Sequence, residues 1–267
     1  MSSAEATRML LEPDEPYPVI IERPDGRSPF VIVCDHAGAA IPTCLNNLGL
    51  TKNDLRRHIA WDIGAAEVAR YLSASFDAPL VMQRYSRLVI DCNRSIDRPD
   101  SIPTISEDTV VPGNLNLSQA EVAKRVHDIF SPYHSTICKL LNDRISNNLE
   151  NAIVSVHSFT PVYLGKTRPW HIGLVYNRDD RLVKALHIVL EDEEEIDANL
   201  CVGDNVPYPM TDEDDFTLPE HGEKRGFIHI MIEIRQDLLE SPQSQIHWAE
   251  RVHNWLTKAY ERLKTNR

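Results

Sequence analysis

The stretch FVIVCDH at residues 30–36 is an apolar run that ends on a histidine, and two later stretches have the same form. Residues 152–157 (AIVSVH) also end on a histidine, and residues 228–233 (IHIMIE) end on a glutamate. Short apolar runs of this kind are typical of strands that are buried in a sheet. In an α/β sheet, groups that carry chemistry collect at the carboxyl ends of the strands. We therefore expect these three ends to meet in one cleft.

Other apolar runs alternate with helical patterns along the rest of the chain. Strands are expected at residues 79–82, 88–90 and 172–176. One helix is expected at residues 61–72, a second begins at a capping box formed by Ser118 and Glu121, and a third begins at Ser241-Pro242. This alternation predicts the α/β class: a single domain with a central, mostly parallel or mixed sheet flanked by helices. Because no repeat or linker is evident, we expect an N-terminal arm over residues 1–17 and one domain over residues 18–267.

The composition is that of a soluble globular protein and argues against two kinds of partner. The chain has 267 residues, 42% hydrophobic and 25% charged, with a formal net charge of -12. Nucleic-acid binding needs a basic stripe for phosphate contacts, and none is visible. No apolar run reaches the length of about 18 residues that a membrane span needs, and the five cysteines are scattered without a pairing pattern. We expect a cytoplasmic protein with reduced thiols that acts on a small molecule.

Two histidines and a glutamate at the expected strand ends are candidates for metal chemistry. Catalytic zinc usually takes three protein ligands, from histidine and carboxylate side chains, and leaves a fourth position to water. His36 and His157 supply two ligands, and Asp62, at the start of the next expected helix, is the preferred third. Asp35 is the alternative third ligand, since Asp62 could instead cap its helix. Glu233, inside an apolar run, then fits the general base that activates water.

Arginines near residue 90 provide a second constellation of candidate site residues. A guanidinium fork binds a carboxylate through two hydrogen bonds, so Arg87 and Arg94 are candidates for holding an acidic substrate, with Asn93 as a further donor. The alternative for each arginine is structural pairing with a nearby aspartate. Arg235 is the last substrate-binding candidate, and its alternative is an ion pair with Glu233.

Two acidic segments are expected to be exposed to solvent. Residues 191–197 (EDEEEID) are expected on an exposed helix face, and residues 212–215 (DEDD) in an exposed loop. Between them lies the segment NVPYPM at residues 205–210, for which no pattern indicates a function.

Four motifs, taken together, resemble the N-formylglutamate amidohydrolase family. They are HAG at residues 36–38, YSR and DCNR between residues 85 and 94, VHSFTP at residues 156–161, and HGEKRG followed by IEIRQDL between residues 221 and 238. They occur in the family's order and cover most of the chain. The family's fold is similar to that of zinc carboxypeptidases, which implies a central mixed sheet with helices on both faces.

The resemblance also implies an activity and roles for individual residues. It implies zinc-dependent cleavage of an N-acyl amide on an acidic amino acid, with one zinc ion per chain. It makes His36 and His157 zinc ligands, places Asp62 at a family aspartate, and puts Glu233 where the related enzymes have their catalytic glutamate. It places three residues among the binders of the substrate carboxylate: Arg87, Asn93 and Arg94.

Two positions depart from the related enzymes. Carboxypeptidases have a ligand glutamate three residues after the first histidine, where this chain has Ala39, and Asp35 stands where proline is expected. The predicted function is a metal-dependent amidohydrolase that acts on an N-acyl amino acid such as N-formylglutamate. The alternatives are a carboxypeptidase or amidase acting on peptides or cell-wall fragments, and a non-catalytic anion-binding protein that retains the fold.

Overall fold

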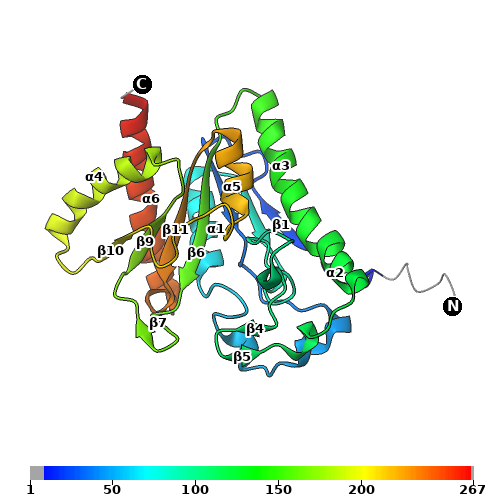
Figure 1. The fold of residues 1–267 in the computed structure, drawn as a ribbon. Helices are drawn as coiled ribbons and strands as arrows, with labels where there is room; N and C mark the ends of the chain where they lie inside the picture. The colour runs from blue at the N-terminus through cyan, green and yellow to red at the C-terminus, as the bar shows by residue number, and fades with distance from the viewer. Residues whose placement is uncertain (1–8, 266–267) are drawn as a thin grey trace, which may run out of the picture.

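A computed structural model describes residues 9–265, apart from the side chains of residues 193–196. Within these residues, seven strands form one central sheet that helices cover on both faces (Figure 1). The strands lie in the order β1 (Val19–Glu22), β3 (Leu80–Gln83), β2 (Phe30–Cys34), β6 (Ala152–Phe159), β11 (Ile228–Arg235), β9 (Ile172–Val175) and β10 (Val202–Asp204). The β1–β3 and β11–β9 pairs are antiparallel, and the other neighbouring pairs are parallel. The predicted single α/β domain with a mixed sheet is confirmed.

The apolar stretches at residues 30–36, 152–157 and 228–233 supply the three middle strands of this sheet, β2, β6 and β11. Their side chains are buried on both faces, apart from the partly buried Arg235. Their apolar side chains alternate between two core clusters, with Ile32, Val154 and Ile230 in the first and Val31, Ile153 and Met231 in the second. β6 and β11 pair in parallel over their whole length, and this register places Glu233 beside His157.

Helices pack against both core clusters (Figure 1). The first cluster includes side chains from α1 (Ala65–Phe76), α4 (Arg181–Ile196) and α6 (Pro242–Thr265). The second includes side chains from α3 (Ser131–Ser146), from the π-helical turn Val126–Phe130 that joins it to α2 (Gln119–Arg125), and from α5 (Thr217–His221). The predicted capping box at the start of α2 is present, with Ser118 and Glu121 each bonding to the other's backbone N–H. The last helix begins at the expected proline, Pro242.

Short elements surround the carboxyl ends of the central strands. The β4 (Ile105–Ser106) and β5 (Thr109–Val110) strands form one hairpin, and β7 (Val162–Tyr163) and β8 (Lys166–Thr167) form another. The two hairpins touch, because the backbone N of Leu164 is 3.4 Å from Oε1 of Glu107. Short 3₁₀ segments lie at Thr43–Gly49, Asp54–Arg56, Pro99–Ser101, Pro112–Asn114, Glu223–Arg225 and Gln236–Leu239.

The expected strand at residues 88–90 is wrong, because this segment is a buried turn and loop. Its apolar side chains are fully buried, which explains the strand-like pattern. Side chains, not a neighbouring strand, satisfy its backbone: Asn114 donates to the Leu88 carbonyl at 2.8 Å, and Arg125 donates to the Val89 carbonyl at 2.9 Å. The helix expected at residues 61–72 begins only at Ala65, which leaves Asp62 in the preceding loop.

Part of the predicted N-terminal arm, residues 1–8, lies outside the described residues. Leu10 is 5% exposed and packs in the second core cluster. The boundary at residue 17 stays a prediction. Between residues 9 and 265, none of the helices combines the length and the apolar character needed to span a bilayer.

Candidate metal centre

The carboxyl ends of the three central strands open into a cavity of about 330 Å³. His36 enters it from the loop after β2, and Asp62 from the loop before α1. His157 and Glu233 enter it from β6 and β11. The structure therefore brings together the four residues predicted for metal binding and catalysis.

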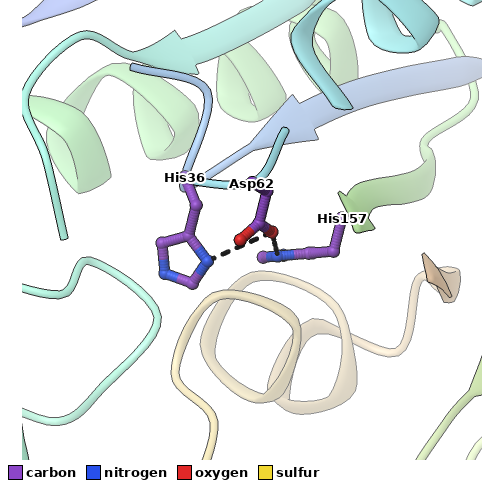
Figure 2. A group of neighbouring side chains, drawn as sticks. All are labelled: His36, Asp62 and His157. Atoms are coloured by element: carbon purple, nitrogen blue, oxygen red, sulfur yellow. Dashed lines mark hydrogen bonds and ion pairs between the residues drawn. The ribbon is translucent and has the colours of Figure 1, made fainter. Parts of the chain in front are cut away.

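Three of these residues form a compact cluster of possible metal ligands (Figure 2). His36, Asp62 and His157 each offer one ligand atom, and the three atoms lie within 4.8 Å of one another. Asp62 Oδ2 is 2.7 Å from Nδ1 of His157 and 3.4 Å from Nδ1 of His36. All three side chains are buried. Two imidazoles and one carboxylate are a donor set that catalytic zinc accepts.

Carboxylates hold the far side of each imidazole. His36 Nε2 is 2.7 Å from Oδ1 of Asp91, and His157 Nε2 is 3.1 Å from Oδ2 of Asp35. Such partners fix the orientation of a ligating imidazole and leave its other nitrogen free for a metal. Asp35 therefore lies behind His157, whereas Asp62 faces Nδ1 of both histidines. This geometry favours Asp62 over Asp35 as the third ligand.

The loop that carries Asp62 is fixed by its backbone. The Asp62 N–H donates to the His36 carbonyl at 2.9 Å, which ties the two candidate ligands together. Gly64 has φ +79, and a Cβ there would lie 2.5 Å from Cβ of Leu239. A larger residue would be strained and crowded, so glycine lets the chain turn between Asp62 and α1.

The cluster holds an excess of buried negative charge. Although burial opposes it, hydrogen bonding and charge interaction with His157 lower the pKa of Asp35 to about 2. Burial also opposes protonation of His157, but its bonds to Asp35 and Asp62 outweigh this and raise the pKa. His36 Nδ1 is buried and has no hydrogen-bond partner. A cation among these carboxylates would balance the charge and use the free nitrogen, so the residues present fit a zinc ion.

Glu233 lies beside the cluster and has a free oxygen. Its side chain is buried, and Oε2 has no hydrogen-bond partner. Burial, with a smaller contribution from the Asp62 charge and against the charges of His157 and His36, raises the pKa of Glu233 to about 7. An unpaired carboxylate of this kind is suited to accept and return a proton near neutral pH.

Three of the four predicted substrate-binding residues, Arg87, Asn93 and Arg94, line the cavity. Arg235 is not among the lining residues. Its Nε is 2.8 Å from Oδ1 of Asp237, and its Nη1 donates to backbone carbonyls of residues 168–170. The structure does not bring Arg235 to the site, and Asp237 takes the place of Glu233 as its ion-pair partner.

The arginines that line the cavity already have carboxylate partners. The shortest ion-pair distances are 2.7 Å for Arg87 with Asp91, 2.7 Å for Arg98 with Asp100, and 3.6 Å for Arg94 with Asp215. Structural pairing, the alternative for these arginines, is therefore present. The Arg94 ion pairs are the longest of this set, and its Nη1 also donates to the backbone carbonyls of Asn93 and Asp214. Of the three arginines, Arg94 therefore has the weakest carboxylate pairing.

The expectation of a solvated loop at residues 212–215 is wrong for Asp215. Its side chain is only 11% exposed, it lines the cavity, and burial raises its pKa. Asn93 Nδ2 donates to Asp215 Oδ1 at 2.8 Å, and Asn93 Oδ1 accepts from the backbone N–H groups of Phe216 and Thr217. These hydrogen bonds from Asn93 hold the acidic loop at the wall of the cavity.

Sequence reasoning missed other residues of the site. Asp91 was noted only as a neighbour of the arginines, and its contact with His36 spans 55 positions. Tyr163 and Tyr208 line the cavity, and Tyr208 belongs to the NVPYPM segment that had no assigned function. The one sequence signal for this segment was its position between the acidic segments at residues 191–197 and 212–215.

Residues 28–240 match the family model described as N-formylglutamate amidohydrolase. The chain belongs to this family. The predicted resemblance is thereby confirmed, and the matched region contains every predicted site residue.

Solved structures add to this result. The chain is similar to a gene product of Agrobacterium tumefaciens, with 36% identity over 96% of this chain and 99% of that one and a TM-score of 0.91. An N-formylglutamate amidohydrolase from Ralstonia eutropha is 17% identical over 90% of this chain and 99% of its own, with a TM-score of 0.67, which shows the fold alone. A metallo-carboxypeptidase from Burkholderia cenocepacia has a TM-score of 0.34, which is too low to show a shared fold. No curated protein matches the sequence.

Proposed function

We propose that this chain is a zinc-dependent amidohydrolase that cleaves the N-acyl amide of an acidic amino acid, with N-formylglutamate as the leading candidate substrate. The observation that carries the proposal is the buried cluster of His36, Asp62 and His157 beside Glu233, whose Oε2 has no hydrogen-bond partner. Membership of the N-formylglutamate amidohydrolase family supports the reaction class.

The proposed mechanism divides the work between these residues. Zinc held by Nδ1 of His36, Nδ1 of His157 and the Asp62 carboxylate would supply Lewis-acid chemistry for hydrolysis of the acyl group. Glu233 Oε2 takes a proton from the attacking water and returns it to the leaving amine nitrogen. Asp35 and Asp91 keep the two imidazoles in the orientation that presents Nδ1 to the cavity.

The proposed substrate is small and acidic. A cavity of about 330 Å³ suits a small molecule. Arg87, Asn93 and Arg94 supply donors at its wall, and Arg94 exchanges its long ion pairs for the substrate carboxylate. The acidic composition and the five scattered cysteines agree with a cytoplasmic enzyme that binds neither nucleic acid nor membrane.

The test is hydrolysis of a panel of N-formyl and N-acetyl amino acids by the purified, zinc-loaded protein. N-formylglutamate or N-formylaspartate should be hydrolysed faster than uncharged N-acyl amides. Release of C-terminal residues from peptides or cell-wall fragments, without cleavage of N-acyl amino acids, would favour the carboxypeptidase alternative. Binding of acidic amino acids without turnover would favour the anion-binding alternative.

A matched pair of arginine variants tests the substrate charge. Arg94→Met should lower kcat/KM for N-formylglutamate by about ten- to hundredfold, the effect of losing one charge-assisted contact. It should affect an uncharged N-acyl amide much less. Arg84→Met is the control, because Arg84 lies outside the cavity lining and donates to the Tyr17 carbonyl at 2.9 Å. An equal loss of kcat/KM on both substrates would show that Arg94 supports the structure and does not bind the substrate carboxylate.

A further inference from the structure

Arg168 follows the β7–β8 hairpin and lies directly behind two tyrosines of the cavity wall. Its guanidinium carbon is 4.6 Å from the centre of the Tyr163 ring and 4.5 Å from the centre of the Tyr208 ring. Both rings line the cavity. Phe159, another lining residue, is 6.0 Å away on the same measure. Three aromatic rings therefore surround one buried cation at the edge of the cavity.

The charge of Arg168 has no carboxylate partner among the side chains that the structure describes. Its side chain is only 9% exposed, and its Nη1 atom is buried without a hydrogen-bond partner. Arg87, Arg94 and Arg98, which line the same cavity, each pair with at least one aspartate. A buried guanidinium is costly unless an anion and acceptors complete it. Arg168 therefore differs from these three arginines in having no described carboxylate of the protein to balance its charge.

Tyr208 connects this charge to the cavity. Arg168 Nη2 donates to the Tyr208 hydroxyl oxygen at 2.5 Å. A hydroxyl that accepts from a guanidinium keeps its own hydrogen for another acceptor, and the described side chains and backbone offer none. Tyr208 is 46% exposed and lines the cavity, so the free hydrogen is available to a bound molecule.

The segment that carries Tyr208 is held closely against the sheet. A Cβ on Gly173 of β9 would lie 2.0 Å from the carbonyl oxygen of Val206, so only glycine allows this approach. Asn205 Oδ1 also accepts from the backbone N of Tyr176 at 3.2 Å. The position of Tyr208 is therefore set by backbone packing, as a binding residue requires.

We propose that Arg168 and Tyr208 form a second carboxylate-binding subsite, in which the Tyr208 hydroxyl donates to the substrate and the Arg168 guanidinium supplies the positive charge behind it. This inference rests on the proposed function, because an N-acyl glutamate or aspartate carries two carboxylates. Arg94 and Arg168 share no partner in the described structure, and we assign each of them to a different carboxylate of the substrate. The chain thereby selects substrates with two carboxylates over those with one.

The test compares three substrates that differ by one carboxylate. N-formyl-L-glutamate has both, N-formyl-L-glutamine lacks the side-chain carboxylate, and 4-formamidobutyrate lacks the α-carboxylate. Tyr208→Phe and Arg168→Met should lower kcat/KM for N-formylglutamate by about ten- to hundredfold, chiefly by raising KM. One of the two monocarboxylates lacks the carboxylate that this subsite binds. On that substrate the loss of kcat/KM in the variants should be about twofold or less. An equal loss on all three, or no loss, overturns the proposal.

The control is Tyr163→Phe. Tyr163 packs on the same guanidinium, but no hydrogen bond joins its hydroxyl to Arg168. Its variant should keep the wild-type ratio of kcat/KM between the dicarboxylate and each monocarboxylate. Thermal unfolding checks the variants, and if Arg168→Met does not fold, the partly exposed Tyr208→Phe carries the test.

Calorimetric titration with glutarate, a plain dicarboxylate, separates this inference from the proposed function. Wild-type protein should bind glutarate about ten- to hundredfold more tightly than Tyr208→Phe. That result without hydrolysis of any panel substrate would reject the proposed function and keep the subsite. Hydrolysis of N-formylglutamate with glutarate binding that is undetectable, or equal in wild type and variant, would keep the proposed function and reject the subsite.

Discussion

Two pairs of buried histidines lie among the residues that the structure describes, and their surroundings shift their pKa values in opposite directions. The rings of His36 and His157 lie 4.9 Å apart at the candidate metal centre. The rings of His134, on α3, and His221, on α5, lie 5.3 Å apart, with Nδ1 of the first 3.1 Å from Nε2 of the second. Each pair brings together residues that are far apart in the sequence, so proximity of histidines alone does not distinguish them.

The difference lies in what faces the rings. Three carboxylates surround the first pair, and they raise the pKa of both histidines in spite of burial. Aromatic rings of Phe130, Tyr133 and Phe216 surround His134. Burial, with the neighbouring histidine as a further cause, lowers the pKa of His134 to about 3, and burial lowers that of His221 to about 4. A buried histidine pair becomes a cation site only where carboxylates complete it.

The second pair is therefore a neutral, hydrogen-bonded part of the core. His134 Nε2 is 2.9 Å from the Cys92 carbonyl oxygen, which can only accept, so this nitrogen carries the hydrogen. Its Nδ1 is then the acceptor for Nε2–H of His221. The network assigns these tautomers, and both rings stay uncharged at neutral pH.

The largest expected effect is on bound metal. Wild-type protein should carry about one zinc ion per chain, because its donor set matches catalytic zinc. His36→Ala and His157→Ala should each lose the zinc and the hydrolytic activity together. Elemental analysis of protein purified without chelator measures this.

The matched control for that experiment is His134→Gln, which alters the other pair. It should keep about one zinc per chain, because no carboxylate cluster surrounds His134 among the described residues. Full zinc occupancy in His157→Ala, or zinc loss in a folded His134→Gln, would contradict the assignment of the metal centre to the pair of His36 and His157.

The next effect concerns the carboxylate beside the first pair. Glu233→Gln preserves shape but cannot accept a proton, so turnover should fall by about two to four orders of magnitude. Zinc content should stay at the wild-type level, because Glu233 is not part of the ligand cluster. The measurement is kcat of the zinc-loaded variant. Wild-type turnover would remove Glu233 from the mechanism.

A smaller effect should follow when one partner behind the imidazoles is changed. Asp91→Asn keeps the size of the side chain but removes the charge opposite His36 Nε2. Partners of ligating histidines contribute about ten- to hundredfold to metal affinity, so competition with a chelator should show a loss in this range. Asp215→Asn is the control, because Asp215 lines the cavity without contacting either histidine ligand. Equal affinities in wild type and Asp91→Asn would show that the carboxylate does not support the site.

The parts of the site that the sequence predicted are those fixed by strand periodicity. His157 and Glu233 end mostly apolar runs, and such runs are typical of strands buried in a sheet, as β6 and β11 are. Asp62 was predicted from a helix start and the family pattern, although α1 begins four residues later than expected. The positions of His157 and Glu233 need only the regular geometry of a sheet, which short sequence patterns record.

The parts that were missed depend on contacts between distant loops. Asp91 meets His36 across 55 positions, and Asn93 meets Asp215 across 122. The turn at residues 88–90 has the apolar pattern of a strand because its side chains are buried, whereas side chains of Asn114 and Arg125 bond to its backbone in place of a neighbouring strand. No periodicity records such pairings, since each is decided by packing of the whole domain.

The smallest expected effect tests the second pair through pH. The folded-state pKa of His221, about 4, lies below the ordinary value near 6.5. The unfolded chain therefore binds more protons between these values, and the free energy of unfolding should decrease as the pH falls from about 6.5 towards 4. Between pH 7 and pH 5 this histidine should account for a loss of about 1–2 kcal/mol. His221→Gln keeps a donor for His134 but cannot titrate, so its urea unfolding free energy should fall less than that of wild type over this interval. If both proteins lose the same free energy, His221 is not held neutral by its surroundings, and the contrast between the two pairs fails on this side.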